Sequence, residues 1–432
     1  MFVKEQKKFT VVTLGCRTNQ YESQAYTDQL LAMGYTQAKE GEEADICVVN
    51  TCTVTESADS SSRYQIRQLA KHHPKAKIIV TGCLAERLPE EIAKIEGVSH
   101  VVPNQEKENL LKVVFPEEDL PEFSIQQFAA HTRAFVKVQD GCNSFCTYCI
   151  IPYVRGRSRS RDLASILKEV ENLVQNGFKE VVLTGINIGD FDGDPQPDTK
   201  PICLAELVRA VDKVEGLKRL RVSSIDPDEV TVDLADAILL GKNTCPSMHI
   251  VLQSGSNAIL KRMNRKYTKQ IFLETVNYLR GRSPDFTFTT DVIVGFPGES
   301  EQDFEETLEV MREVKFAKVH MFPYSERPRT KAATYKNKVP QDVIQKRKQV
   351  VLRLSEEIAF SLRGEYIGRE MEVLLEKQDS HTPGYIAGHT TNFLPILVKT
   401  EGELSSNELV VVKIIENSPE GLLATRIEKN AN

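Results

Sequence analysis

The stretch QDGCNSFCTYCIIPYVRGRSRSR, residues 139–161, decides how the rest of the sequence is interpreted. It sets Cys142, Cys146 and Cys149 at a CxxxCxxC spacing. A closed structural zinc site needs four ligands, usually in CxxC pairs. Three thiolates fit an iron–sulfur cube better, because one cysteine normally holds each iron and one iron then stays open. The competing interpretation is a zinc site completed by His131, which precedes the motif without the usual ligand spacing.

Positive charge follows the three cysteines at once. The arginines are Arg155, Arg157, Arg159 and Arg161. Residues 257–270 carry a net charge of +5 and residues 327–348 carry +7, although the whole chain has a net charge of −6. An acidic protein that concentrates basic residues in a few segments is typical of a nucleic-acid binder, so we expect the four arginines to meet phosphates. The alternative is that they belong to ordinary solvated helix faces.

Length and composition indicate a globular protein of several domains. The chain has 432 residues, about three domains, and 41% of them are hydrophobic. No apolar run approaches the ~18 residues of a membrane span, and the start MFVKEQKKFT lacks an export signal. We therefore expect a cytoplasmic protein without membrane contact. Nine cysteines in a reducing compartment favour metal or redox chemistry over disulfides.

The cysteine loop lies in a predicted barrel over residues 129–362. A linker near FPEEDLPEFSIQQF precedes six strand-like runs that alternate with helical segments, which predicts an incomplete (β/α)6 barrel. The loop follows the first strand at its carboxyl end, where such barrels keep their chemistry. Polar or glycine residues also end the later strands and are candidate cofactor contacts, with ordinary turns as the alternative. They are Thr184, Gly185, Ser223, Ser224, Gln253 and Gly295.

Residues 1–128 predict a parallel α/β domain with its own cysteines. The strand-like runs FTVVTLGC, ADICVVNTC and AKIIVTGC end in Cys16, Cys52 and Cys83. Parallel strands deliver their carboxyl ends to one edge of a sheet, so the three thiols are expected to converge there. Each thiol alone is explained equally well as a small buried residue. Cys47 lies inside a strand and is expected in the core.

Residues 363–432 change to short strands separated by Gly, Pro, Asn and Ser, which predicts a small all-β barrel. This segment holds seven basic and eleven acidic side chains, a net charge of −4. If it contacts RNA, it does so through a local face or through shape.

A CxxxCxxC motif on the first loop of an incomplete barrel resembles the radical S-adenosylmethionine enzymes. The resemblance implies a 4Fe-4S cluster whose open iron chelates the amino and carboxylate groups of S-adenosyl-L-methionine. It also implies a low-potential electron donor, whose electron cleaves the sulfonium bond and yields a 5′-deoxyadenosyl radical.

The whole chain resembles the methylthiotransferases within that class. The N-terminal motifs GCRTNQYES, VNTCTV and VTGCLAER, the barrel, and a C-terminal domain similar to TRAM follow the family plan. The resemblance assigns Cys16, Cys52 and Cys83 to a second 4Fe-4S cluster that carries sulfur to the activated carbon. It implies two S-adenosylmethionine molecules per turnover, one donating methyl and the other making the radical. TRAM domains are usually credited with RNA binding, which the acidic balance here does not favour.

Branches of the family differ in substrate. The segments at residues 15–23, 50–63 and 142–161 look most like the branch that acts on threonylcarbamoyladenosine beside the anticodon of tRNA. The resemblance thus predicts methylthio transfer to carbon 2 of that base, with the tRNA anticodon loop, and not DNA, as partner. Arg155 is a candidate to read the threonylcarbamoyl carboxylate. SERPRTKA departs from the usual YSxRxGT pattern, with Arg329 at the glycine position.

Alternatives remain open at this point. Other branches act on isopentenyl-type adenosine in tRNA or on an aspartate of a ribosomal protein. A different class of function is a non-catalytic RNA-binding protein with a structural metal.

Overall fold

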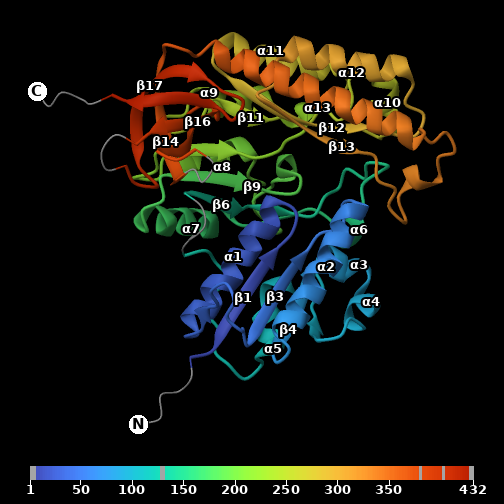
Figure 1. The fold of residues 1–432 in the computed structure, drawn as a ribbon, viewed down its shortest axis with the longest axis vertical. Coiled ribbons are helices and arrows are strands. Elements are labelled where there is room, and N and C mark those ends of the chain that lie inside the picture. Colours follow the sequence, from blue (N-terminus) through green and yellow to red (C-terminus); the bar gives the residue numbers. More distant parts are fainter. Residues whose placement is uncertain (1–5, 127–131, 379–381, 401–403, 428–432) are drawn as a thin grey trace, which may run out of the picture.

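The computed structural model describes residues 6–126, 132–378, 382–400 and 404–427. Figure 1 shows three parts: a blue N-terminal sheet with its helices, a green-to-orange partial barrel, and a red β-barrel. The predicted fold class is confirmed. The predicted boundary at 128/129 and His131 lie outside the described residues, and the predicted boundary at 362/363 falls in the last turn of a helix that ends at Gly364.

The N-terminal sheet is parallel, in the order β2-β1-β3-β4-β5. Its central strand β3 reads ICVVNT and is buried along its whole length, because helices cover both faces. The strands are β1 Lys8–Thr13, β2 Thr36–Gln37, β3 Ile46–Thr51, β4 Lys77–Gly82 and β5 Val98–Val101. The helices are α1 Arg17–Ala32, α2 Glu56–His72, α3 Cys83–Arg87, α4 Pro89–Ala93 and α5 Leu110–Val114. Cys47 is fully buried in β3, as predicted.

Six parallel strands form the partial barrel, as two sheets of order β10-β9-β6 and β11-β12-β13. Parallel bridges between Leu220 and Thr244 and between Ile225 and Ile250 join the sheets. The strands are β6 Arg133–Lys137, β9 Glu180–Thr184, β10 Arg219–Val222, β11 Ser247–His249, β12 Thr287–Val294 and β13 Lys318–Pro323. The longer helices are α7 Leu163–Gln175, α8 Leu204–Asp212, α9 Val232–Leu239, α10 Asn257–Arg262, α11 Lys269–Arg282, α12 Glu301–Val314 and α13 Gln341–Gly364.

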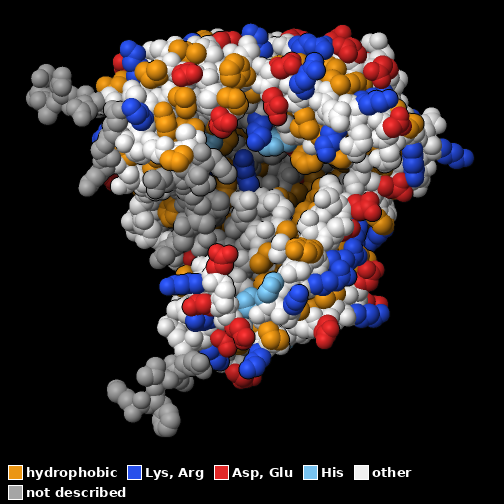
Figure 2. All heavy atoms as spheres, viewed as in Figure 1, with side chains coloured by type: hydrophobic (Ala, Val, Ile, Leu, Met, Phe, Trp, Pro, Cys, Tyr) orange, Lys and Arg blue, Asp and Glu red, His pale blue; other side chains and the backbone are white. Residues whose placement is uncertain are grey.

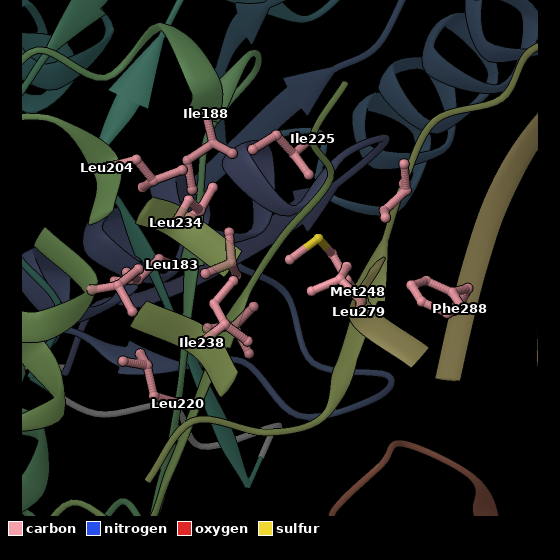
Figure 3. Packing of buried hydrophobic residues seen from close by; sticks show 14 of the residues in the cluster. Leu183, Ile188, Leu204, Leu220, Ile225, Leu234, Ile238, Met248, Leu279 and Phe288 are labelled. Atoms are coloured by element: carbon pink, nitrogen blue, oxygen red, sulfur yellow. The ribbon is translucent and has the colours of Figure 1, made fainter. Parts of the chain in front are cut away.

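The barrel core lies between the strands and these helices. Figure 3 shows Leu183, Leu220 and Phe288 of the strands among Leu234 and other helix residues, all buried. Because side chains alternate along a strand, the neighbours of Leu220 face the other way. Arg219 and Arg221 are buried there with Glu180, whose carboxylate lies 2.8 Å from the Arg221 Nε. On β10, the side chains that face the barrel interior are therefore charged, and the side chain that faces the helices is apolar.

A closed five-stranded barrel of order β14-β15-β16-β18-β17 ends the chain. Its strands are β14 Glu370–Gln378, β15 Tyr385–Thr390, β16 Pro395–Lys399, β17 Leu409–Asn417 and β18 Leu422–Arg426. It is tied to the partial barrel by Arg219, which donates to the Glu372 and His389 carbonyls at 2.9 and 3.0 Å, and by Arg221, which donates to the Thr390 carbonyl at 3.2 Å. No helix among the described residues is long and apolar enough to cross a membrane.

Candidate active site

The three N-terminal cysteines lie at neighbouring strand ends. Cys16 follows β1 and caps α1, Cys52 comes directly after β3, and Cys83 begins α3 directly after β4. A Cβ on Gly15 would stand 2.9 Å from the Cys52 sulfur, so the Cys16 loop packs against Cys52. Burial raises the pKa of Cys52 to about 11, and the adjacent Cys83 and Cys16 thiols add to the shift. The structure thus brings these three thiols, the N-terminal triad, to one sheet edge.

Two asparagines that the sequence did not single out position the N-terminal triad. Asn19 donates to the Leu14 and Thr51 carbonyls at 2.6 and 3.1 Å, which joins the ends of β1 and β3, and its Oδ1 accepts from the Cys16 thiol at 3.6 Å. The Asn104 amide lies 3.9 Å from the Cys83 sulfur and donates to the Val154 carbonyl at 2.6 Å. The only sequence signal was the nearness of Asn19 to Cys16; Asn104 had none.

The barrel triad, Cys142, Cys146 and Cys149, lies on the loop after β6. The loop opens with β7 (Gln139–Asp140), which pairs with β8 (Arg159–Ser160), and it carries α6 (Ile151–Val154). Gly141 has φ 74°, and a Cβ there would stand 2.0 Å from the Arg157 carbonyl oxygen. Only glycine fits this close approach.

Polar groups also fix the barrel triad. Arg265 donates to the Cys146 sulfur at 3.0 Å and pairs with Asp226. The Thr147 amide donates to the Met263 carbonyl at 2.9 Å, which anchors the loop to the end of α10. Burial raises the pKa of Cys149 to about 12, and the neighbouring Cys146 and Cys142 contribute. A guanidinium on one sulfur and mutual repulsion among the thiols suit a site that a cationic metal group fills.

Among the described residues, no three His, Cys, Asp or Glu side chains stand close enough together to hold a single metal ion. A four-iron cube makes a different demand, because each thiolate binds a different iron and the sulfurs therefore stand further apart.

A buried charge network lies between the two triads. Arg155 has a fully buried side chain and pairs with Asp140 at 2.8 Å and Glu22 at 3.3 Å. Lys107 pairs with Glu22 at 2.7 Å and with Asp140. Although burial opposes it, Lys107 and Arg155 lower the pKa of Glu22 to about 2. The network ties α1 to the strand that leads into the barrel triad.

This position corrects one expectation. The Arg155 guanidinium has no exposed surface, and it lies 4.0 Å from the Cys16 sulfur with Glu22, Asp140 and Asn19 as partners. It has no surface for an RNA phosphate and no vacant donor fork for a substrate carboxylate. Arg161 is also engaged, with Glu169 at 2.6 Å and the Tyr21 hydroxyl at 3.1 Å.

The remaining two predicted arginines are exposed, and one of them lies over an aromatic ring. The Arg157 guanidinium lies 4.4 Å from the Phe145 ring centre, and Arg159 is 48% exposed. Arg329 lies 4.9 Å from the Tyr153 ring centre. Its φ of 70° is in the left-handed region that favours glycine, so the family preference for glycine at this position has a conformational cause.

The predicted strand-end residues lie along the carboxyl edge of the barrel. Thr184 ends β9 and Gly185 follows it, and the Gln139 side chain accepts from the next two amides at 2.9 Å each. Ser224 follows Ser223 after β10, and Gln253 and Gly295 have φ of 62° and 76° after β11 and β12. Among the described residues, three buried side-chain oxygens at this edge lack hydrogen-bond partners. They are Ser223 Oγ, Gln253 Oε1 and Glu229 Oε2.

The edge also carries an uncompensated carboxyl group. Burial raises the pKa of Glu229 to about 7, with Asp226 adding to the shift. Glu229 Oε1 accepts from Asn187 at 3.0 Å, but Asp190 and Asp228 add like charge. A bound group with positive charge and several donors would satisfy both the vacant acceptors and the carboxylate. S-adenosylmethionine, which carries a sulfonium cation, an adenine amino group and two ribose hydroxyls, fits these requirements.

A parallel partial barrel with three cysteines on its first loop defines the class of radical S-adenosylmethionine enzymes. A Radical SAM superfamily model matches residues 136–311, and a model described as uncharacterized protein family UPF0004 matches residues 8–103. Enzymes of this superfamily use S-adenosylmethionine and a 4Fe-4S cluster. The fold is similar to that of the radical methyltransferase TsrM from Kitasatospora setae, with TM-score 0.55 and 13% identity over 88% of this chain and 80% of that one.

Curated relatives define the family more narrowly. The chain is 48% identical to "Threonylcarbamoyladenosine tRNA methylthiotransferase MtaB" of Chlamydia pneumoniae, over 98% of this chain and 99% of the relative. It is 37% identical to the protein of the same name in Bacillus subtilis, over 94% and 93%. It is 35% identical to "tRNA-2-methylthio-N(6)-dimethylallyladenosine synthase" of Carboxydothermus hydrogenoformans, over 95% and 97%. The chain belongs to the radical S-adenosylmethionine methylthiotransferase family.

Proposed function

We propose that this enzyme adds a methylthio group to carbon 2 of threonylcarbamoyladenosine beside the anticodon of tRNA, using two 4Fe-4S clusters. The observation that carries the proposal is the pairing of two cysteine triads, with Arg155 between the loop of Cys16 and that of Cys142. The names of the most similar relatives support this substrate over the dimethylallyl one.

The six cysteines are the proposed cluster ligands. Cys142, Cys146 and Cys149 would hold the cluster that binds S-adenosylmethionine, and Cys16, Cys52 and Cys83 would hold the second one. When bound, these groups supply the 5′-deoxyadenosyl radical and the sulfur that is transferred. Arg265 holds the Cys146 sulfur in place, and Asn19 and Asn104 orient the N-terminal triad.

The vacant acceptors at the barrel edge are the proposed contacts of S-adenosylmethionine. Ser223 Oγ and Gln253 Oε1 lie buried and without partners at the edge that carries the barrel triad. Glu229 would pair with a positive group of the cofactor. Thr184, Gly185, Ser224 and Gly295 line the same edge through their backbone and complete the set that the sequence predicted.

A basic and aromatic surface beside the barrel triad is the proposed RNA contact. A depression there is lined by Phe145, Tyr153, Lys261, Arg262 and Lys331 among others, and Arg157 and Arg329 lie over two of its rings. Aromatic rings accept unstacked loop bases and cations meet phosphates, so the surface suits a single-stranded RNA loop. A loop base also leaves its stack at lower cost than a paired base.

The test is nucleoside mass spectrometry. Enzyme reconstituted with iron and sulfide under anaerobic conditions, supplied with a low-potential reductant, is given matched tRNAs that carry threonylcarbamoyl, isopentenyl or unmodified adenosine. We expect the methylthio product on the threonylcarbamoyl tRNA. Equal turnover of all three, or preference for isopentenyl, would refute the substrate while leaving the radical chemistry intact.

A further inference from the structure

A small basic cavity lies against the strands of the partial barrel, and none of the six candidate cluster cysteines lines it. Its volume is about 30 Å3, and residues from all three parts of the chain line it. Arg17 reaches it from α1, and Phe393 from the C-terminal barrel. The barrel itself contributes Arg133, Arg221, Ser247 and His249, together with apolar residues. Three arginines thus share a space that holds about two water-sized groups.

The three arginines differ in their partners. Arg133 pairs with Glu376 at 2.9 Å, and Arg221 pairs with Glu180 at 2.8 Å. Arg17 forms no ion pair or hydrogen bond within the part of the chain that the structure describes; its guanidinium lies 5.6 Å from the Phe135 ring centre. The Arg17 donors are therefore available inside a partly enclosed space.

Among the described residues, no carboxylate forms an ion pair with Arg17. Two carboxylates next to the cavity lining lie beside other groups: the Asp291 carboxylate is 3.4 Å from the His249 Nε2, and the Glu180 carboxylate is 2.8 Å from the Arg221 Nε. Arg133 and Arg221 line the same cavity as Arg17 and carry the same charge. An unpaired guanidinium beside two further cations costs free energy that an anionic ligand would recover.

The shape of the site indicates which anion it takes. A guanidinium presents parallel N–H groups that match a carboxylate in bidentate fashion, and the cavity is too small for a base or a ribose. Figure 2 shows a hollow between the N-terminal part and the barrel, with basic and histidine side chains in it. His320, exposed on β13, lies 5.7 Å from His249, ring centre to ring centre, so the cavity lining at His249 adjoins exposed surface.

We propose that Arg17 binds the carboxylate of the threonylcarbamoyl group, with Arg133 and Arg221 supplying the positive wall of the cavity. The inference rests on the proposed function. Arg17 directly follows Cys16, so a nucleoside whose carboxylate reaches into this cavity keeps its adenine near the N-terminal triad. An isopentenyl group has no carboxylate, so it gains nothing from Arg17. The site therefore explains how one family scaffold selects between the two modified adenosines.

The test compares two anticodon stem-loop RNAs that differ in one group: threonylcarbamoyladenosine and its carboxamide analogue. Dissociation constants are measured with full-length reconstituted enzyme in the absence of S-adenosylmethionine, so that no turnover occurs. We expect wild type to bind the acid about 10- to 100-fold more tightly than the amide. Arg17→Gln should bind both equally, and Arg17→Lys should keep part of the preference.

Arg209→Gln is the matched control, because Arg209 is exposed on α8 and pairs with Asp233. It should keep the wild-type preference, and iron content should stay unchanged in every variant. A preference for the acid that persists in Arg17→Gln, or an equal loss of affinity for both RNAs, would overturn the inference. Wild-type turnover of isopentenyl RNA and not of threonylcarbamoyl RNA would instead refute the proposed function, whatever Arg17 does.

Discussion

The two cysteine triads are built in opposite ways. The barrel triad lies within eight residues of one loop, whereas the N-terminal triad draws Cys16, Cys52 and Cys83 from three strand ends. A local spacing motif identifies the first by itself. The second exists only because parallel strands end at one edge of a sheet, so it depends on the fold of a whole domain.

The charges around the two triads also differ. On the N-terminal side, Lys107 and Arg155 compensate Glu22 and hold its pKa at about 2. On the barrel side, burial raises the pKa of Glu229 to about 7, and its acidic neighbours add to the shift. The first pattern suits a fixed joint between two parts of the chain. The second suits a place where a positively charged cofactor supplies the missing charge.

The strongest test of the comparison is to remove each triad. Replacing Cys142, Cys146 and Cys149 by alanine should abolish cleavage of S-adenosylmethionine completely. Replacing Cys16, Cys52 and Cys83 should leave that cleavage intact and abolish methylthio transfer. Each change should remove about half the iron. A chemical assay measures the iron, and the 5′-deoxyadenosine formed measures the cleavage of S-adenosylmethionine.

Cys203→Ala is the control, because this cysteine is exposed at the start of α8 and belongs to neither triad, so its loss should leave iron content unchanged. Cleavage that persists without the barrel triad would reverse the assignment of the two sites.

Arg155 tests whether the joint between the triads is structural. Arg155→Met leaves Glu22 and Asp140 buried with one cation fewer, which should lower the free energy of unfolding by about 3 kcal/mol. Arg157→Met, two residues on and exposed, should cost less than about 0.5 kcal/mol. Urea unfolding of the cluster-free protein measures both. Similar losses in the two variants would mean that Arg155 does not hold the parts together.

The sequence predicted the fold and the cysteines because those features have a period or a spacing. The β3 run ICVVNT and the alternating strands and helices are visible in one dimension, and so is CxxxCxxC. The arginine run has no period or spacing that predicts which side chains are buried. The residues at 155, 157, 159 and 161 alternate as if on one strand, but α6 ends at Val154 and Gly156 turns the chain with a φ of 80°. Arg155 is therefore buried and Arg161 pairs with Glu169, whereas the other two arginines are exposed.

Long-range partners escaped the sequence for the same reason. Arg265 meets Cys146 from 119 positions away, and Asn104 meets Val154 across the joint between two parts of the chain. Arg17 was visible beside Cys16, but its cavity is completed by strands and by Phe393 far along the chain. Such contacts follow from tertiary packing, which no local pattern records.

The basic surface beside the barrel triad gives a third, smaller effect. Arg157→Glu or Arg159→Glu should weaken tRNA binding about tenfold near physiological salt, because each removes a phosphate contact and adds repulsion. The slope of log affinity against log salt should fall by about one unit. Filter binding at salt concentrations from about 50 to about 300 mM measures the slope.

Arg312→Glu on α12 is the matched control. Arg312 is exposed and pairs with Glu305 at 2.7 Å, and it does not line the depression of the proposed RNA surface. An unchanged slope in the Arg157 and Arg159 variants would mean that these residues are ordinary solvated surface and do not contact RNA phosphates.

The smallest predicted effect concerns the uncompensated carboxyl group of Glu229. Its pKa in the folded, cofactor-free protein is about 7, above its value in the unfolded chain, so it favours folding below about pH 4.5 and loses that contribution as the pH rises through 7. Glu229→Gln cannot ionise, so its stability relative to wild type should improve by about 1 kcal/mol between pH 5.5 and pH 8, after allowance for partial exposure. Urea unfolding at both pH values measures the change. A cationic cofactor in the site should remove the pH dependence, because its charge pairs with the ionised carboxylate. If the stability difference between Glu229→Gln and wild type is equal at both pH values, the Glu229 carboxylate is already compensated in the cofactor-free protein.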